Sequence, residues 1–203
     1  MSEGQPGRFP DVFVTDLHHF LDLPEDTPGP ARRLAEHLAR IVRAATAGDA
    51  GTPWQTALPC RRRPGNRACP GRITVRQDGP GTPIRWECSG CGDEGVISNW
   101  ECSPFDLRRQ GLAVAGPVTE IIIPDDVAAA LRELTLLDTD CQRLVFRLRA
   151  HPDGAVLAVG DDDLDELIGF VAAEANHEPN RRRQRRLDTA FDALSAAQAS
   201  PGW

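Results

Sequence analysis

Apolar residues follow a helical pattern in one N-terminal segment of the chain. Between positions 34 and 45 they recur every three or four residues, which predicts an amphipathic helix over residues 31–46. Pro30 suits the entry to such a helix, and Gly48 is a typical end. Five prolines lie in residues 1–30, so we expect an irregular arm with one short element before the helix.

The pattern changes from helical to alternating at residue 60. Residues 47–59, rich in small residues and proline, predict a loop before the change. Three short strand candidates follow, at 72–76, 84–87 and 95–100, separated by glycine–proline turn signals and by the sequence Cys-Ser-Gly-Cys-Gly. Strands this short cannot bury a core by themselves.

The C-terminal part of the chain combines helical and alternating patterns. The predicted strands are 118–123 and 155–159, and the predicted helices begin near Asp125, near Asp161 and before Leu187. Residues 141–149 fit a helix, but they also alternate with arginines before a Pro-Asp-Gly turn, as a hairpin would. We favour the helix and expect a small sheet covered by three or four helices.

Together these patterns predict an α+β protein in three parts. We expect an N-terminal arm and amphipathic helix in residues 1–59, a small three-stranded module in residues 60–103, and an α+β domain in residues 117–198. The module is therefore expected to be inserted between a helical segment and the C-terminal domain.

The composition is that of an ordinary globular protein, with 40% apolar and 26% charged residues. All 23 basic residues are arginine, a bias that a bacterial genome of high GC content would produce. The sequence contains no long apolar run and does not begin like a signal peptide, so we expect a cytoplasmic protein without a membrane segment. Because cytoplasmic thiols stay reduced, closely spaced cysteines indicate metal binding or redox chemistry before disulfides.

Four of the six cysteines are spaced like the ligands of one metal ion. Cys88 and Cys91 are separated by Ser-Gly, a tight turn that aims two sulfurs at one point, and eighteen residues separate Cys69 from Cys88. Zn²⁺ prefers four such soft ligands in a tetrahedron. No βαβ pattern follows Cys91, which disfavours a redox motif.

These motifs resemble the zinc-ribbon superfamily over residues 60–100. The resemblance implies a hairpin fold around one structural Zn²⁺ but no particular activity. The first half departs from the superfamily pattern, because eight residues separate Cys60 from Cys69 and require an enlarged loop. We predict Cys60, Cys69, Cys88 and Cys91 as the ligands, with Cys102 as the alternative to Cys60.

Two clusters of arginine are candidates for binding anions. Residues 60–91 hold seven arginines against two acidic residues, a net charge of +5 in a chain of −7. A second run lies at a predicted helix start, the positive end of the helix dipole, so an acidic group is expected nearby. That group is either the acidic segment 161–166 or a nucleic-acid phosphate, unless the run is merely solvated. The candidate residues are Arg61, Arg62, Arg63, Arg181, Arg182, Arg183, Arg185 and Arg186.

No catalytic motif stands out, so we expect a non-catalytic zinc-binding protein that acts as a protein-interaction or regulatory adaptor, with a protein partner or self-association. The alternative is a nucleic-acid-associated protein, in which Trp86 and Trp100 would stack on bases. A metal-dependent hydrolase ranks last. It would use the His18-His19 pair, or Glu174 with His177.

Overall fold

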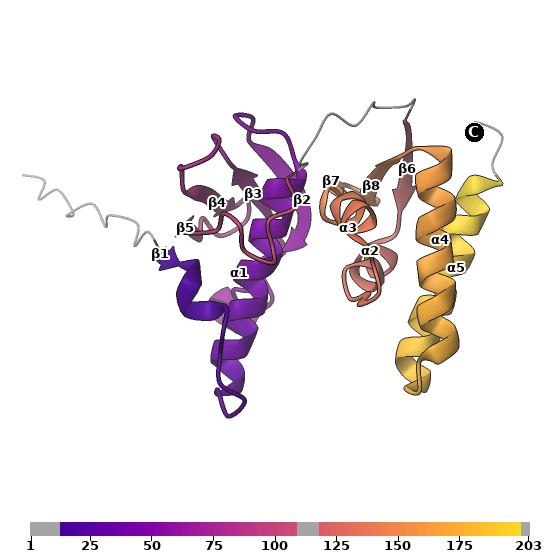
Figure 1. Ribbon diagram of the computed structural model, residues 1–203, viewed down its shortest axis with the longest axis horizontal. Coiled ribbons are helices and arrows are strands. Elements are labelled where there is room, and N and C mark those ends of the chain that lie inside the picture. Colours follow the sequence, from indigo (N-terminus) through magenta and orange to yellow (C-terminus); the bar gives the residue numbers. More distant parts are fainter. Residues whose placement is uncertain (1–12, 109–117, 200–203) are drawn as a thin grey trace, which may run out of the picture.

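The computed structural model describes residues 13–108 and 118–199, which form an α+β fold (Figure 1). Within these residues eight strands make one sheet in the order β1-β5-β4-β3-β2-β7-β8-β6, accompanied by five α-helices. The strands are β1 (Phe13–Asp16), β2 (Trp54–Pro59), β3 (Arg72–Arg76), β4 (Ile84–Cys88), β5 (Glu94–Ser98), β6 (Thr119–Ile123), β7 (Arg149–His151) and β8 (Gly154–Val159). The helices are α1 (Gly29–Ala47), α2 (Asp125–Leu131), α3 (Thr139–Phe146), α4 (Asp161–His177) and α5 (Arg181–Gln198).

The N-terminal half is a four-stranded antiparallel meander, β2 to β5, covered by α1 (Figure 1). The predicted helix over 31–46 and the predicted strands are confirmed, with shifts of one or two residues at most ends. The loop predicted over 47–59 is wrong at its end, where residues 54–59 form β2, so this half has a fourth strand. The apolar stripe of α1 packs on the sheet because its period of 3.6 residues turns one face inward. The core residues of this contact are Leu38, Ile41, Val42, Ala45, Ile73, Val75, Ile84 and Ile97.

The short element expected in the N-terminal arm is strand β1, which pairs in parallel with β5. A side chain at Gly95 would collide with the carbonyl oxygen of Phe13 at 2.6 Å, so this glycine permits the pairing. A short 3₁₀ helix, Leu17–Phe20, follows β1. Its N-cap is Asp16, whose carboxylate accepts a hydrogen bond from the backbone N–H of His18. Strand β1 is one edge of the eight-stranded sheet, and β6 is the other.

The C-terminal half has its own core between strands β6–β8 and four helices. Helices α4 and α5 form a hairpin along one side (Figure 1). Segment 141–149, which fitted either a helix or a hairpin strand, is helical up to Phe146, where α3 ends. Strand β7 then begins at Arg149 and forms a hairpin with β8. Of the helices in the described parts of the chain, none is long and apolar enough to cross a membrane.

Strand β2 joins the two halves of the sheet at Thr56. The strand pairs with β3 at both ends, but its register shifts in the middle, where Thr56 pairs with Arg149 of β7. The buried Thr56 hydroxyl replaces the missing ladder bonds: it donates to the carbonyl of Ile73 at 2.7 Å and accepts from the N–H of Leu58 at 3.1 Å. This β-bulge lets β2 pair with β3 of the N-terminal half and with β7 of the C-terminal half.

Replacing Thr56 by valine tests this junction. Valine keeps the shape but leaves a buried N–H and a buried carbonyl without their partner, so we expect the free energy of unfolding to fall by about 1–3 kcal/mol. Thr56→Ser keeps the hydroxyl and should lose only about 1 kcal/mol for the missing methyl group. Urea denaturation of both variants measures the difference. Equal losses would show that the hydroxyl does not hold the bulge.

Candidate metal centre

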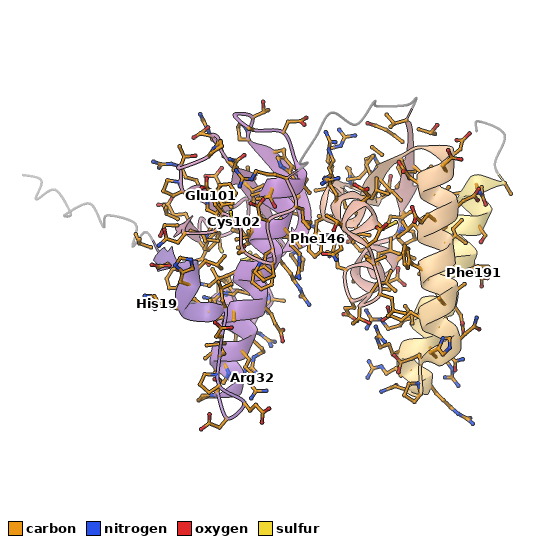
Figure 2. All side chains as sticks on the ribbon, in the orientation of Figure 1. His19, Arg32, Glu101, Cys102, Phe146 and Phe191 are labelled. Carbon is orange, nitrogen blue, oxygen red and sulfur yellow. The ribbon has the colours of Figure 1, made fainter. Side chains whose placement is uncertain are left out.

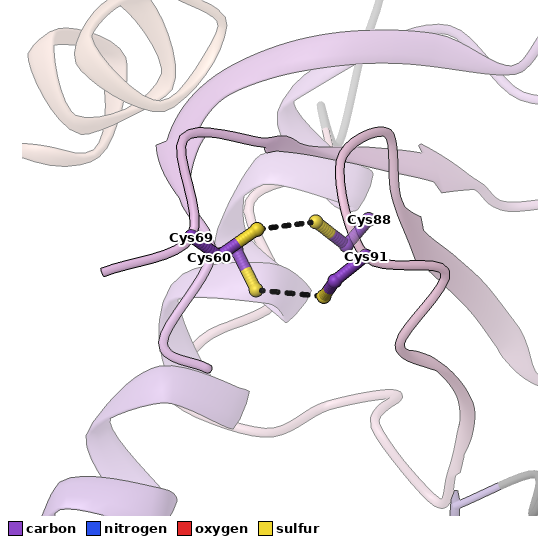
Figure 3. Close-up of side chains that lie close together, drawn as sticks. All are labelled: Cys60, Cys69, Cys88 and Cys91. Carbon is purple, nitrogen blue, oxygen red and sulfur yellow. Dashed lines mark hydrogen bonds between the residues drawn. The ribbon is translucent and has the colours of Figure 1, made fainter. Parts of the chain in front are cut away.

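The four predicted cysteines come together at one end of the N-terminal sheet (Figure 3). Cys60 follows β2, Cys69 precedes β3, Cys88 ends β4, and Cys91 lies in the turn before β5. Their sulfur atoms all lie within 4.8 Å of one another. These residues form a cluster that can hold one metal ion.

The spacing of the thiols fits tetrahedral coordination of one metal ion. The distance between sulfur atoms is 3.7 Å for Cys60 and Cys91 and 3.7 Å for Cys69 and Cys88. Four sulfurs placed about 2.3 Å from a central Zn²⁺ would lie about 3.8 Å apart. All four cysteines are free thiols, so no disulfide competes for the sulfurs.

The loop from Cys60 to Cys69 continues the hairpin of β2 and β3 beyond the strands. The backbone N–H of Cys60 donates to Gly71 at 3.0 Å, and that of Cys69 donates to Arg62 at 3.0 Å. A turn at Pro64–Asn66, in which Gly65 has a φ of 59°, reverses the chain between them. Eight intervening residues therefore deliver two sulfurs to one point, as a tighter turn would.

The second loop is the tight turn predicted from Cys-Ser-Gly-Cys-Gly. The backbone N–H of Cys88 donates to the carbonyl of Asp93 at 2.7 Å, and that of Gly92 donates to the carbonyl of Cys88 at 3.1 Å. Gly92 has a φ of 67°, in the left-handed region that favours glycine. This turn holds Cys91 on the same side as Cys88.

Backbone N–H groups point at the sulfurs, each from the residue two positions further on. The N–H groups of Arg62 and Gly71 lie 3.4 Å from the sulfurs of Cys60 and Cys69, and that of Gly90 lies 3.3 Å from Cys88. Such donors stabilise the thiolate form, which is the form that binds metals.

The pKa values of the thiols differ with their surroundings. Burial opposes ionisation of Cys88, but hydrogen bonds from the backbone of Gly90 and Cys91 and from neighbouring thiols outweigh it and lower the Cys88 pKa. Burial raises the pKa of Cys60 and also that of Cys91. Thiolates this close repel one another, so full ionisation of the cluster needs a cation.

Two glycines allow the two loops to meet. A Cβ atom at Gly71 would lie 2.5 Å from the sulfur of Cys88 and 2.5 Å from the backbone nitrogen of Gly90. A Cβ atom at Gly90 would lie 2.9 Å from Gly71 and 3.1 Å from the sulfur of Cys69. The sulfurs therefore reach their spacing only because neither position carries a side chain.

The other two cysteines lie outside the cluster. Cys102 is exposed, and its backbone N–H donates to the carboxylate of Asp106 at 3.2 Å. Cys141 is buried in the core on α3, where burial raises its pKa to about 12. Of the two residues considered as the fourth ligand, Cys60 and not Cys102 lies in the cluster, with its sulfur 3.7 Å from that of Cys91.

The arginines of the loop from Cys60 to Cys69, called the metal loop below because of the ion it could hold, are exposed. Arg62 lies 3.5 Å from the carboxylate of Asp93, and among the described residues Arg61, Arg63 and Arg67 form no ion pair. The loop is thus a cationic surface directly outside the thiol cluster.

The arginine run on α5 has internal partners, although not the expected ones. The guanidinium of Arg183 hydrogen-bonds the carboxylates of Glu174 and Glu178, and Arg186 pairs with Glu133 at 2.9 Å. No ion pair joins the run to the acidic segment 161–166 within residues 118–199, so of the possibilities left open by the sequence, that segment is not the partner. Helices α4 and α5 meet with their adjoining ends together, which places the run beside the end of α4 and not its start.

Several residues considered for catalysis or base stacking serve the fold instead. Glu174 is buried and accepts hydrogen bonds from the backbone of Thr135 at 2.8 Å as well as from Arg183, while His177 contacts the carbonyl of its own helix at Ala173. The side chains of Trp86 and Trp100 are only 4% and 1% exposed, so the prediction that they stack on bases is wrong. The alternation along β4 was a signal for Trp86, because it shares the apolar face of the strand with Ile84 and Cys88.

Comparison with known proteins adds no relative. No protein-family model matches the chain, and no match was found among curated proteins or solved structures.

Replacing Gly71 by alanine tests the close approach of the loops. The added methyl group collides with Cys88 and Gly90, so the affinity for added Co²⁺ or Zn²⁺ should fall about tenfold or more. Titration followed by the Co²⁺ absorption bands measures the affinity. Gly169→Ala, in an open position on α4, is the control and should bind metal like the unaltered protein. Equal affinities for the two variants would contradict the geometry.

Proposed function

We propose that Cys60, Cys69, Cys88 and Cys91 hold one structural Zn²⁺, and that the protein is a non-catalytic adaptor built around this site. The proposal rests on the four thiols, which can fill all four positions of a tetrahedral site. Catalytic zinc sites keep one position open for water or substrate, whereas sites with four cysteine ligands are structural. The ion would contribute binding free energy to folding and no chemistry of its own.

Zinc is favoured over other ions by the ligand type. Four sulfurs at tetrahedral spacing suit Zn²⁺ or an iron centre, while Mg²⁺ and Ca²⁺ require oxygen ligands. The backbone N–H groups directed at the sulfurs would offset the charge of four thiolates around a divalent ion. On this proposal residues 60–100 form a zinc-ribbon-like unit whose strands are shared with a larger sheet.

Two exposed sheet edges support a role in protein interaction. Val14 on edge strand β1 is 74% exposed, and Ile122 on edge strand β6 is 54% exposed. Unpaired edge strands with exposed apolar residues favour pairing with another chain or a second copy. The adaptor would use such an edge together with the cationic metal loop.

Nucleic-acid binding is the second candidate. It is favoured by Arg61, Arg63 and Arg67, which are exposed on the metal loop and form no ion pair with a described residue. The burial of both candidate stacking tryptophans removes the sequence-tolerant base contacts that single-strand binders use. We therefore rank the adaptor first.

Native mass spectrometry tests the metal. We expect one Zn²⁺ per chain in protein purified from cells, and loss of that Zn²⁺ in Cys88→Ser, because three thiolates bind it much more weakly than four. Cys102→Ser is the matched control and should keep the ion, since this exposed cysteine lies outside the cluster. Protein without zinc, or equal zinc loss in both variants, would contradict the site.

Binding measurements separate the two candidate functions. If the protein is an adaptor, a fluorescent 20-nucleotide single strand or duplex should bind no more tightly to the unaltered protein than to the triple variant Arg61→Ala, Arg63→Ala, Arg67→Ala. The double variant Arg32→Ala, Arg33→Ala, on the exposed start of α1, controls for charge removal. Tight, salt-dependent binding lost only in the loop variant would instead establish the nucleic-acid function.

Capture of partners tests the adaptor directly. Tagged full-length protein, captured from its own cells after nuclease treatment, should retain a protein partner or a second copy of itself. Val14→Arg should release it if edge strand β1 is the docking site, and Ile122→Arg if β6 is. Recovery of nucleic acid alone before nuclease treatment, and of no protein after it, would reject the adaptor.

A further inference from the structure

A cleft of 570 Å³ lies between α1 and the segment that runs from α2 to α3. Its walls come from both halves of the protein: Arg40 and Arg43 from α1, Phe105 from the loop after β5, and Arg132 and Phe146 from the C-terminal half. Phe146 lies between α3 and α1 (Figure 2). The cleft is separate from the four-thiol cluster, none of whose cysteines lines it.

Three arginines that form no ion pair with a described residue line this cleft. Within the described residues, Arg40, Arg43 and Arg132 form no ion pair, and one guanidinium nitrogen each of Arg43 and Arg132 is buried without a hydrogen bond. Glu36 and Glu133 also line the cleft, but neither pairs with these arginines, and Glu133 is already held by Arg186. Arg40 is exposed and Arg43 and Arg132 are half-buried, and the unpaired buried guanidinium nitrogens of the last two can donate to an anion that enters the cleft.

The pKa values of two of these arginines are lower than usual. Burial, reinforced by the charges of Arg40 and Arg72 and only partly opposed by the carboxylates of Asp125 and Glu133, lowers the pKa of Arg132 to about 10. Burial and the charge of Arg40 also lower the pKa of Arg43. A negative group bound between the arginines would reverse both effects, because it favours the charged forms.

The cleft offers apolar surface beside the cations. The guanidinium carbon of Arg43 lies 4.7 Å from the ring centre of Phe105 and 5.4 Å from that of Phe146, so the two rings hold it in place. Phe20 and Leu134 line the same space. A volume of this size suits a small organic molecule.

We propose that this cleft binds a small organic anion. A phosphate or carboxylate group would be held by Arg40, Arg43 and Arg132, and an apolar part of the molecule would lie against Phe20, Phe105 and Phe146. Because the walls come from both halves of the chain, the bound anion would tie them together. The ligand would thereby stabilise one relative position of the metal loop and the C-terminal helices.

Phenyl phosphate and benzoate are the probes that test the cleft. At constant ionic strength, we expect phenyl phosphate to bind in isothermal titration calorimetry and to raise the melting temperature. Inorganic phosphate should bind more weakly because it lacks the ring, and phenol should not bind because it lacks the charge. Benzoate, compared with phenyl phosphate, shows whether the cleft prefers carboxylate or phosphate.

Substitution of Arg132 separates a binding site from a structural one. Arg132→Met should weaken phenyl phosphate binding about tenfold or more, while the melting temperature without ligand stays equal or rises, since a half-buried cation without an ion pair is removed. Arg43→Met should weaken binding similarly and serves if the first variant folds poorly, and Arg132→Lys should restore part of the affinity. Arg32→Met, at an exposed position of α1 outside the cleft, should bind like the unaltered protein (Figure 2).

Three outcomes would overturn the proposal. One is that none of the anionic probes binds to the protein with its metal loaded. Another is that they bind equally well to Arg132→Met, Arg43→Met and Arg32→Met. The third is that Arg132→Met and Arg43→Met both lower the melting temperature strongly without ligand, which would show that these arginines support the fold and not a ligand.

Discussion

Two loops of the N-terminal half approach so closely at Gly71 and Gly90 that no Cβ atom fits between them. This contact determines where the thiols at the ends of β2, β3 and β4 can lie, and it sets their sulfurs 3.7 Å apart in facing pairs (Figure 3). Four thiolates at that distance repel one another without a cation. The proposed Zn²⁺ would remove this repulsion and join the loops, while the strands behind them are already held by the core under α1.

The junction at Thr56 determines how the two halves of the molecule are arranged. Because β2 leaves β3 there and pairs with β7, the sheet runs on from one half to the other. That continuity brings α1 alongside α3, where Arg143 donates to the carbonyl of Leu107 at 2.9 Å. The arginine-lined cleft opens beside this contact. The same strand therefore places one cysteine of the cluster and positions both walls of the cleft.

Sequence patterns predicted most of what is local in this structure. Helical spacing located α1, alternation located β3 to β5, and cysteine spacing selected the four residues that cluster, including Cys60 across its long loop. These features depend on residues close together in sequence.

What the sequence did not predict depends on contacts between distant segments. The parallel pairing of β1 with β5, the union of the strands into one sheet, and the ion pair of Arg186 with Glu133 all join residues that no periodicity relates. The burial of Trp86 and Trp100 also depends on which helix covers the sheet. The cleft was missed for the same reason, since its arginines come from α1 and from the end of α2, and spacing along the chain does not bring them together.

X-ray absorption spectroscopy at the zinc edge, on the protein loaded with one equivalent of Zn²⁺, would show whether the proposed site is closed by four sulfurs. We expect four sulfur ligands at about 2.3 Å and no nitrogen or oxygen in the coordination shell. A shell that includes water, carboxylate or histidine would contradict it, because the site would then have an open or mixed coordination and the metal would no longer be purely structural.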